Sequence, residues 1–236
     1  MMPSSSTDTG RVPPASNQAN PLSIDKNESY RRKLVQCQYC MRSKAEGLTL
    51  SKCAGCRLEL YCSKECQKKA WPLHKAKCHM NQRNRLKSDD PLMDERIKRL
   101  RDFTKEHGPT IVEAGIRALQ IGIRPENAQE FVLALLVRER PSTRPELSYF
   151  VTDAEVVPIE AFGEATNDLR EEMKALIEHQ KHCGDPVAGA FIVTLRDPEH
   201  NLTTLSPTGY GASTTYDKPM PWREWVMAHM NGGILL

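Results

Sequence analysis

The sequence lacks the features that would place it in a membrane or a secretory pathway. Its longest unbroken run of aliphatic and aromatic residues, Phe131 to Val137, is far shorter than the ~20 residues of a membrane helix. The first thirty residues contain no basic segment followed by an apolar one, so they do not resemble a secretory signal. We therefore expect a chain of the nucleus or the cytoplasm, where cysteines stay reduced.

The sequence also lacks recognisable catalytic motifs. It contains no glycine-rich phosphate loop and no Gly-x-Ser-x-Gly nucleophile motif. His179, His182 and Cys183 crowd the end of a predicted helix, and such a group could bind a transition metal. We interpret them instead as solvated residues at a helix end. We therefore expect no enzyme activity, and the alternative is an unrecognised active site in residues 93–236.

What the sequence does contain is a dense group of metal ligands. Seven of its eight cysteines and one histidine form four pairs, with two or three residues between the members of each pair. Each pair can turn both donors toward one ion, and eight donors match two tetrahedral Zn²⁺ ions. Because all eight positions are filled by protein, both ions are expected to be structural. The predicted ligands are Cys37, Cys40, Cys53, Cys56, Cys62, Cys66, His74 and Cys78.

Disulfide bonds and buried thiols are the competing interpretations of these cysteines. A disulfide framework requires an oxidising compartment, which the first thirty residues do not indicate. His79, next to the last ligand, could replace it, although a solvated histidine at a helix end is the simpler interpretation. We therefore predict two structural zinc ions per chain.

The residues between the ligands predict a small fold built around the metal. Leu58 to Tyr61 has the pattern of a short strand, and Ser63 is suited to cap the N-terminus of a helix. Pro72 is placed to start a second short helix. On that helix His74 and Cys78 lie four residues apart, so both can face one ion.

This string of ligands resembles the MYND-type zinc finger. The match also includes Tyr61 before the fifth ligand, Gln67 after the sixth and Trp71 before the histidine, and it covers under a fifth of the chain. The resemblance implies interleaved ligation, whereas spacing alone leaves sequential pairing open. One ion would bind the first and third pairs, Cys37, Cys40, Cys62 and Cys66, and the other Cys53, Cys56, His74 and Cys78.

The resemblance also implies a function in protein recognition. Fingers of this type dock short proline-containing peptides, often of the Pro-x-Leu-x-Pro kind, along the free edge of a hairpin. By motif match, Gln67 and Trp71 would line that groove. Trp71 also fits the role of a core residue that supports the helix, and one amphipathic indole can do both. We therefore predict a protein-interaction module, possible settings being transcriptional or other regulatory complexes.

Two further resemblances bear on the rest of the chain. Some proteins with such a finger are SET-type lysine methyltransferases, but the Asn-His-Ser and Gly-Glu-Glu-Leu elements of those enzymes are missing here. The C-terminal pattern is similar to the region that follows MYND fingers in fungal proteins of unassigned role. Neither resemblance implies an activity for this chain.

A nucleic-acid-binding regulator is the remaining alternative. Residues 37–78 hold nine Lys and Arg against three Asp and Glu, but two zinc ions with seven thiolates lower the net charge from +6 to about +3. No ladder of aromatic residues accompanies these charges, and residues 91–236 carry a net charge of −6. We therefore expect protein partners, and neither nucleic acid nor a membrane.

Composition divides the chain into four parts. Residues 1–30, with four prolines and six serines, are predicted to be a disordered tail. The finger occupies residues 31–80, a polar linker residues 81–92, and a domain of unknown function residues 93–236. Because the linker separates two cores, we expect the finger and the domain to fold independently.

The C-terminal domain shows a mixed pattern of helices and strands. Apolar residues at helical spacing predict helices, and alternating or continuous apolar runs predict strands. The pattern indicates an α+β fold with a small, mostly antiparallel sheet and helices packed on one side. The predicted helices are 92–106, 110–120, 161–182 and 221–229, and the predicted strands are 130–138, 147–159, 188–195 and 202–210.

Overall fold

A computed structural model describes most of the chain, and the statements below concern only the residues that it describes. The predicted tail, residues 1–30, and Cys183 lie outside them. The described residues are 35–40, 42–86, 90–182, 187–211 and 221–236.

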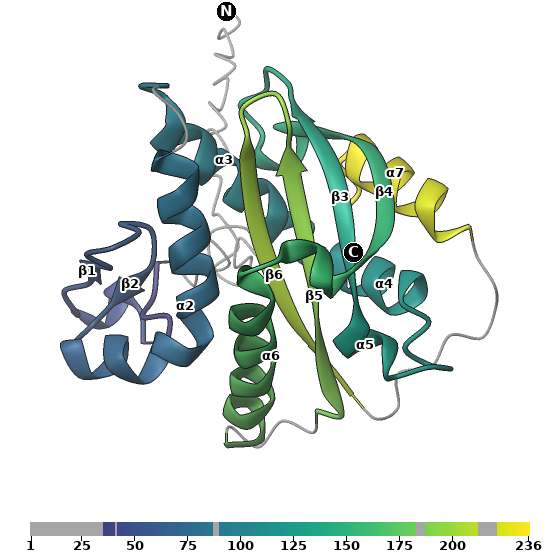
Figure 1. Cartoon of the computed structure of the whole chain (residues 1–236). Coiled ribbons are helices and arrows are strands. Elements are labelled where there is room, and N and C mark those ends of the chain that lie inside the picture. Colours follow the sequence, from purple (N-terminus) through teal and green to yellow (C-terminus); the bar gives the residue numbers. More distant parts are fainter. Residues whose placement is uncertain (1–34, 41, 87–89, 183–186, 212–220) are drawn as a thin grey trace, which may run out of the picture.

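The cysteine-rich segment forms a short hairpin followed by a long helix (Figure 1). Strands β1 (Ser51–Lys52) and β2 (Leu60–Tyr61) pair in antiparallel fashion, and helix α2 runs from Lys64 to Leu86. The predicted cap is confirmed, because the Cys66 N–H donates a hydrogen bond of 3.1 Å to the Ser63 hydroxyl. The 3₁₀ turn η1 (Lys44–Glu46) lies in the loop before β1.

Pro72 lies inside α2 and does not start a new helix, so this part of the prediction is wrong. A proline removes one helical hydrogen bond and bends the helix, but it does not have to end it. Figure 1 shows this bend, since the first turns of α2 run across the picture and the rest runs upward. Because of this bend, the start of α2 packs within the finger and its later turns pack against the four-stranded sheet.

The C-terminal domain is built on a four-stranded sheet with the order β4-β3-β5-β6. The outer pairs, β3 with β4 and β5 with β6, are antiparallel, while the central pair β3 and β5 is parallel. The prediction of four strands in a mostly antiparallel sheet is therefore confirmed. The strands are β3 (Phe131–Glu139), β4 (Tyr149–Pro158), β5 (Gly189–Asp197) and β6 (Leu202–Tyr210).

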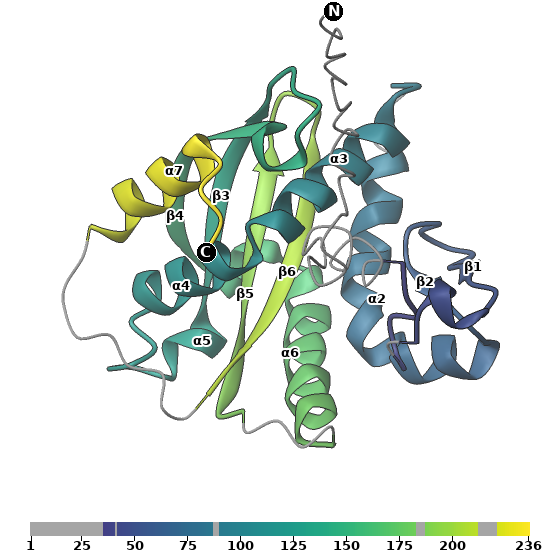
Figure 2. The same ribbon diagram turned by 180° about the vertical axis from the view of Figure 1, so that it is seen from behind.

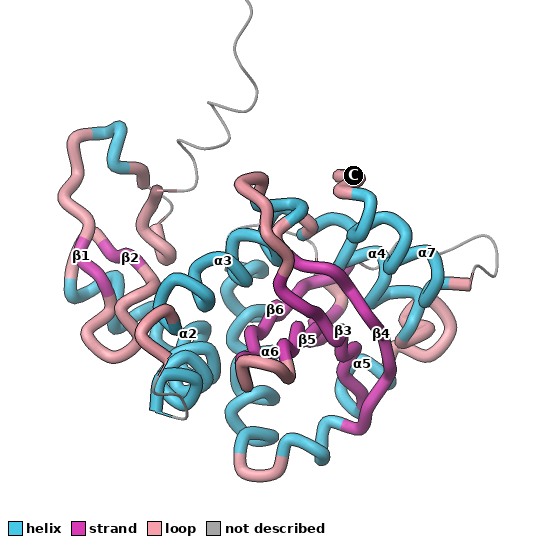
Figure 3. The backbone as a smooth tube through the Cα atoms, turned by 90° about the horizontal axis from the view of Figure 1, so that it is seen from above, coloured by secondary structure: helices cyan, strands magenta, loops and turns pink. Residues whose placement is uncertain are grey.

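Helices cover both faces of this sheet, so the prediction of helices on one side is wrong (Figure 3). Neighbouring strand residues point to opposite faces, and each face has its own apolar core. Leu133 and Val193 belong to the core beneath α3, α4 and α7, whereas Val132 and Ile192 belong to the core beneath α6. The helices are α3 (Met93–Glu106), α4 (Gly108–Ala118), α5 (Asn127–Glu130), α6 (Ala165–His182) and α7 (Trp222–Gly232), with 3₁₀ turns η2 (Pro145–Leu147) and η3 (Ile159–Phe162).

Helix α2 joins the finger to the sheet, because it packs against α6 and β6 (Figure 2). Ala76 of α2 is buried in the same apolar core as α6, and Met80 packs against that core. On the surface, Lys75 forms an ion pair of 2.9 Å with Asp168 of α6. Residues 81–86, in the segment predicted as a linker, form the last turns of α2. The finger and the domain therefore share a core, which argues against independent folding.

Each edge of the sheet is capped by an asparagine side chain. The Asn84 amide of α2 donates to the Thr203 carbonyl of β6 at 2.7 Å and accepts from the Thr203 N–H at 3.3 Å. The Asn231 amide of α7 makes the same pair of bonds with Val151 of β4, at 2.9 and 2.7 Å. Each amide pairs with the N–H and the carbonyl of one edge residue, as a neighbouring strand would. It therefore satisfies two backbone groups that would otherwise lack a partner at the edge of the sheet.

We predict that Asn84→Ala weakens the contact between the finger and the sheet. The substitution leaves the Thr203 N–H and carbonyl without their partner in a buried place, which costs about 1–3 kcal/mol. Urea unfolding of the zinc-loaded protein should show this loss. Lys68→Ala, on the exposed side of the same helix, should change the free energy of unfolding by less than about 0.5 kcal/mol. Equal stability of the two variants would contradict the capping role.

Candidate metal centre

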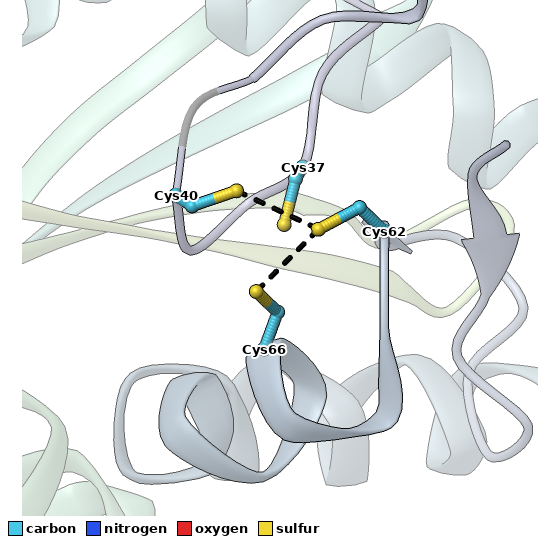
Figure 4. Close-up of side chains that lie close together, drawn as sticks. All are labelled: Cys37, Cys40, Cys62 and Cys66. Atoms are coloured by element: carbon cyan, nitrogen blue, oxygen red, sulfur yellow. Dashed lines mark hydrogen bonds between the residues drawn. The ribbon is translucent and has the colours of Figure 1, made fainter. Parts of the chain in front are cut away.

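Four cysteine thiols meet between the loop before β1 and the start of α2 (Figure 4). Cys37 and Cys40 come from that loop, Cys62 follows β2, and Cys66 lies in the first turn of α2. All four sulfur atoms lie within 4.8 Å of one another. The Cys62 sulfur is 3.6 Å from that of Cys40 and 3.5 Å from that of Cys66. Tetrahedral Zn²⁺ with bonds of about 2.3 Å separates its sulfur ligands by about 3.8 Å, so this group fits zinc.

The second group of ligands lies deeper, between the hairpin and the middle of α2. The Cys53 and Cys78 sulfurs are 3.9 Å apart, and the Cys56 sulfur is 3.4 Å from His74 Nε2. All four residues are buried, and their ligand atoms also lie within 4.8 Å of one another. Burial lowers the pKa of His74 to about 4, so the imidazole is neutral near pH 7 and offers a lone pair to a metal.

The two groups establish the interleaved arrangement that the resemblance implies. The first ligand pair meets the third, and the second meets the fourth, so sequential pairing is excluded. Both groups supply four protein donors in a space that suits a tetrahedral ion, and the chain therefore holds two structural zinc sites. Together they tie the N-terminal loop, the hairpin and α2 into one unit.

Three side chains around the ligands support these sites. Gln67 Nε2 donates to the Cys53 sulfur at 3.6 Å, and Gln82 Nε2 donates to the Cys78 sulfur at 3.2 Å. The Arg85 guanidinium donates to the Cys56 carbonyl. Such donors orient thiolate ligands and offset their charge. The sequence analysis missed Gln82 and Arg85, although the i, i+4 spacing of Gln82 from a ligand on one helix was an available signal.

Gly55 lies where the second site leaves no room for a side chain. A Cβ atom at this position would lie 2.9 Å from Gln82 Nε2 and 3.1 Å from the Cys78 sulfur. A larger residue in the Cys53–Cys56 turn would therefore have to displace the Gln82 amide from the Cys78 sulfur.

The two residues assigned to peptide binding lie on one side of α2. Trp71 is 39% exposed, and the edge of its indole faces the rings of His74 and His79, with centroids about 6 Å away. Gln67 stands one helical turn before it and reaches the ligand Cys53. Trp71 thus has a supporting contact with a zinc ligand and an exposed surface at the same time.

One edge of the hairpin, that of β2, already makes a backbone hydrogen bond with another segment. The Leu60 carbonyl of β2 points away from β1 and accepts the Gln38 N–H at 2.9 Å. Within the described part of the chain, Ser51 and Lys52 of β1 make backbone hydrogen bonds only toward β2, and both residues are exposed. The edge open to another strand therefore belongs to β1.

Comparison with known proteins agrees with this geometry. Residues 35–78 match the sequence model of the family described as MYND finger. These residues are a MYND finger. Such fingers are zinc-binding protein-interaction modules, so the prediction of two zinc ions is confirmed, and protein partners are supported in general terms.

Two of the relatives that the chain matches align with a short part of it. N-lysine methyltransferase SMYD2 of Homo sapiens is 52% identical over 42 residues, which are 18% of this chain and 9% of that protein. SET domain-containing protein 14 of Caenorhabditis elegans is 46% identical over 57 residues, 24% of this chain and 11% of that protein. The match spans about a tenth of each relative, so their activities do not carry over. No solved structure matches the chain.

The other candidate ligands whose side chains the structure describes, His79 and His179, belong to neither metal-binding group. His79 Nδ1 lies 3.0 Å from an Asp168 oxygen and takes no part in either zinc group. The ring of His179 lies 5.7 Å from the ring of Tyr39, and Cys183 lies outside the described residues. Among the residues that the structure describes, the MYND finger holds both metal-binding groups. No helix among the described residues is long and apolar enough to cross a membrane.

We predict that Cys56→Ser reduces the zinc content from two ions per chain to at most one and destabilises the whole protein. The loss reaches the sheet because α2 carries both Cys78 and the apolar contact of Ala76. Elemental analysis and thermal unfolding by circular dichroism measure the two effects. Cys183→Ser removes the cysteine that belongs to neither group and should retain two zinc ions. An unchanged melting temperature in Cys56→Ser would show that the domains are independent.

We also predict that acidification releases zinc well above pH 4. Burial raises the pKa of the Cys78 thiol to about 12, so zinc must displace a proton to bind this ligand at neutral pH. As the pH falls, protons compete better for the thiolates, and zinc affinity decreases. His74, with a pKa of about 4, stays neutral through this range and does not set the midpoint. A zinc-sensitive dye across a pH series measures release, and a single midpoint near pH 4 would contradict control by the thiolates.

Proposed function

We propose that the MYND finger docks an extended, proline-containing peptide of a partner protein across Trp71 and along the edge of β1. The exposed, metal-supported indole of Trp71 is the observation that carries this proposal. An aromatic ring with a rigid support and an open face is a common anchor in protein interfaces. Proline rings suit such a surface because they lose little conformational freedom on binding.

The position of β1 supports the same surface. Cys53 directly follows β1, and Gln67 donates to the Cys53 sulfur, so the end of β1 lies near the first turns of α2. Trp71 lies one turn further along the same side of the helix. An extended peptide could therefore pair its backbone with β1 and place one side chain against the indole. The edge of β2 is not available for such pairing, because the Leu60 carbonyl already accepts the Gln38 N–H.

The rest of the chain fits the role of an adaptor. We propose that the domain of residues 93–236 is a non-catalytic scaffold, since the cavity beside α3 is lined by Arg96 and Arg99 that are both paired with Glu139. Structural thiolate sites last in a reducing compartment, so we propose the nucleus or the cytoplasm as the place of action. Regulatory complexes that assemble through short peptides are the setting that this arrangement suits.

We predict that Trp71→Ala weakens the binding of a Pro-x-Leu-x-Pro peptide by about tenfold or more, as the loss of an aromatic anchor does. Fluorescence anisotropy of a labelled peptide with zinc-loaded protein measures the affinity. Phe150→Ala removes an aromatic ring of similar exposure, 44%, from strand β4 and should leave binding unchanged. Equal binding by wild type and Trp71→Ala, with two zinc ions in each, would disprove the groove.

Gln67→Ala should weaken peptide binding as well, but it also removes a donor to Cys53. Loss of such a donor lowers metal affinity by about 10–100-fold. Peptide binding should therefore be measured in excess zinc, with the zinc content of each variant determined in parallel. A variant that keeps two zinc ions and full peptide affinity would remove Gln67 from the groove.

A further inference from the structure

A cavity of about 210 Å³ lies where the MYND finger meets α6 and β6. Ala70, Leu73 and Lys77 of α2 form one wall, and Glu172 and Leu176 of α6 form the opposite wall. Figure 1 shows α2 and α6 side by side, which places the cavity at the junction of the two parts of the chain. Neither Gln67 nor Trp71 lines it. Drug-sized ligands need about 300 Å³ or more, so this cavity suits a single side chain or a molecule of similar size.

The carboxylate of Glu172 is the unusual group in this cavity. Its side chain is 1% exposed, and neither oxygen has a hydrogen-bond partner among the described residues. The nearest cation is the Lys77 ammonium, 3.9 Å from Oε1, which is too far for a hydrogen bond. The preceding residue, Glu171, is exposed and pairs with Lys75 at 3.3 Å. Glu172 is therefore a buried acceptor whose hydrogen-bonding capacity is left open.

The residues around Glu172 indicate which chemical group could satisfy its open hydrogen-bond acceptors. Leu73 and Leu176 supply apolar walls, and the ring of Tyr61 supplies an aromatic one. Glu59 also lines the cavity, but its carboxylate is already bound by Arg101 at 2.8 Å. A carboxylate only accepts hydrogen bonds, so the complementary group is a donor. The Lys77 ammonium also lines the wall, but it is too far from Glu172 to donate a hydrogen bond, so the open carboxylate disfavours an anion. The apolar surface favours an aliphatic stem.

We propose that this cavity binds a primary alkylammonium ion, with the stem between Leu73 and Leu176 and the ammonium donating hydrogen bonds to Glu172. A lysine side chain of a partner protein and a free alkylamine present the same chemistry. Three N–H donors on a compact cation match the two open oxygens, and charge-assisted hydrogen bonds of this kind are strong in a dry site. The site is separate from the peptide groove and does not depend on it.

The cost of the unpartnered carboxylate supports this assignment. Burial raises the pKa of Glu172 to about 7, which means that the ionised form is poorly stabilised by its present surroundings. A bound ammonium would offset that penalty, and part of its binding free energy would come from this relief.

Calorimetric titration of the full, zinc-loaded chain with n-butylammonium tests the proposal. We expect saturable binding at millimolar concentration, and no saturable binding of butan-1-ol, which has the same stem without the charge. Glu172→Gln keeps the size of the side chain and should weaken amine binding at least tenfold. Glu171→Gln is the matched control on the same helix and should bind as wild type does. The zinc content of every variant is measured alongside.

A second pair of probes distinguishes the two sources of the ammonium. N-acetyl-lysinamide should bind more tightly than n-butylammonium if the cavity receives a lysine side chain from a protein, and more weakly if its mouth admits only a free amine. If Glu172→Gln loses zinc, Leu176→Phe provides the test, because it fills the cavity without changing its charge and should abolish binding. Absence of saturable binding by both amines in wild type overturns the proposal. Unchanged affinity in Glu172→Gln or Leu176→Phe, or equal binding of butan-1-ol, does so too.

Discussion

Coordination of two Zn²⁺ ions is the interaction on which the rest of this structure depends. The finger has only a small apolar core, made largely of its own ligands with Tyr61 and Ala70. Structural zinc contributes about 10–16 kcal/mol of apparent binding free energy in small finger peptides, which is more than such a core supplies. The ligand pairs are interleaved, so neither ion can be removed without loosening the loop, the hairpin and α2 together.

Helix α2 carries the effect of the metal into the C-terminal domain. Its middle holds His74 and Cys78 on the side of the second zinc site, while Ala76 belongs to the core that α6 shares with the sheet. Its last turns place Asn84 against the edge strand β6. A fixed helix axis is needed for all of these contacts at once. The metal sites therefore act as a part of the folding core of the larger domain.

The sequence was informative where the signal is local and chemical. Donor spacing identified the eight ligands, Ser63 identified the start of α2, and the continuous apolar run of β3 identified a buried strand. Pro72 suggests a helix boundary, because a proline lacks the backbone N–H that a helix interior uses. In the structure α2 continues through Pro72, and His74 and Cys78 beyond it belong to one metal-binding group.

Features that depend on distant segments could not be predicted in the same way. The continuous apolar run of β3 is typical of a strand that is covered on both faces. The sequence does not show, however, that α2 packs with α6 against the second face of the sheet. Arg85 donates to the carbonyl of Cys56, 29 residues away in the sequence, and no local spacing indicates that contact. In the sequence, Glu172 is one of several acidic residues on an amphipathic helix. Its burial results from the packing of α2 against α6, which the sequence does not show.

The two sides of α2 explain how one small metal module could serve two kinds of contact. Trp71 is partly exposed to solvent, whereas Leu73 and Lys77 line the cavity that contains Glu172. Both surfaces take their shape from the same helix, and His74 stands between them as a zinc ligand that touches Trp71 and lines the cavity. A change at the second zinc site therefore alters both surfaces. A ligand bound at either surface would lie close to the imidazole of His74, which binds the metal.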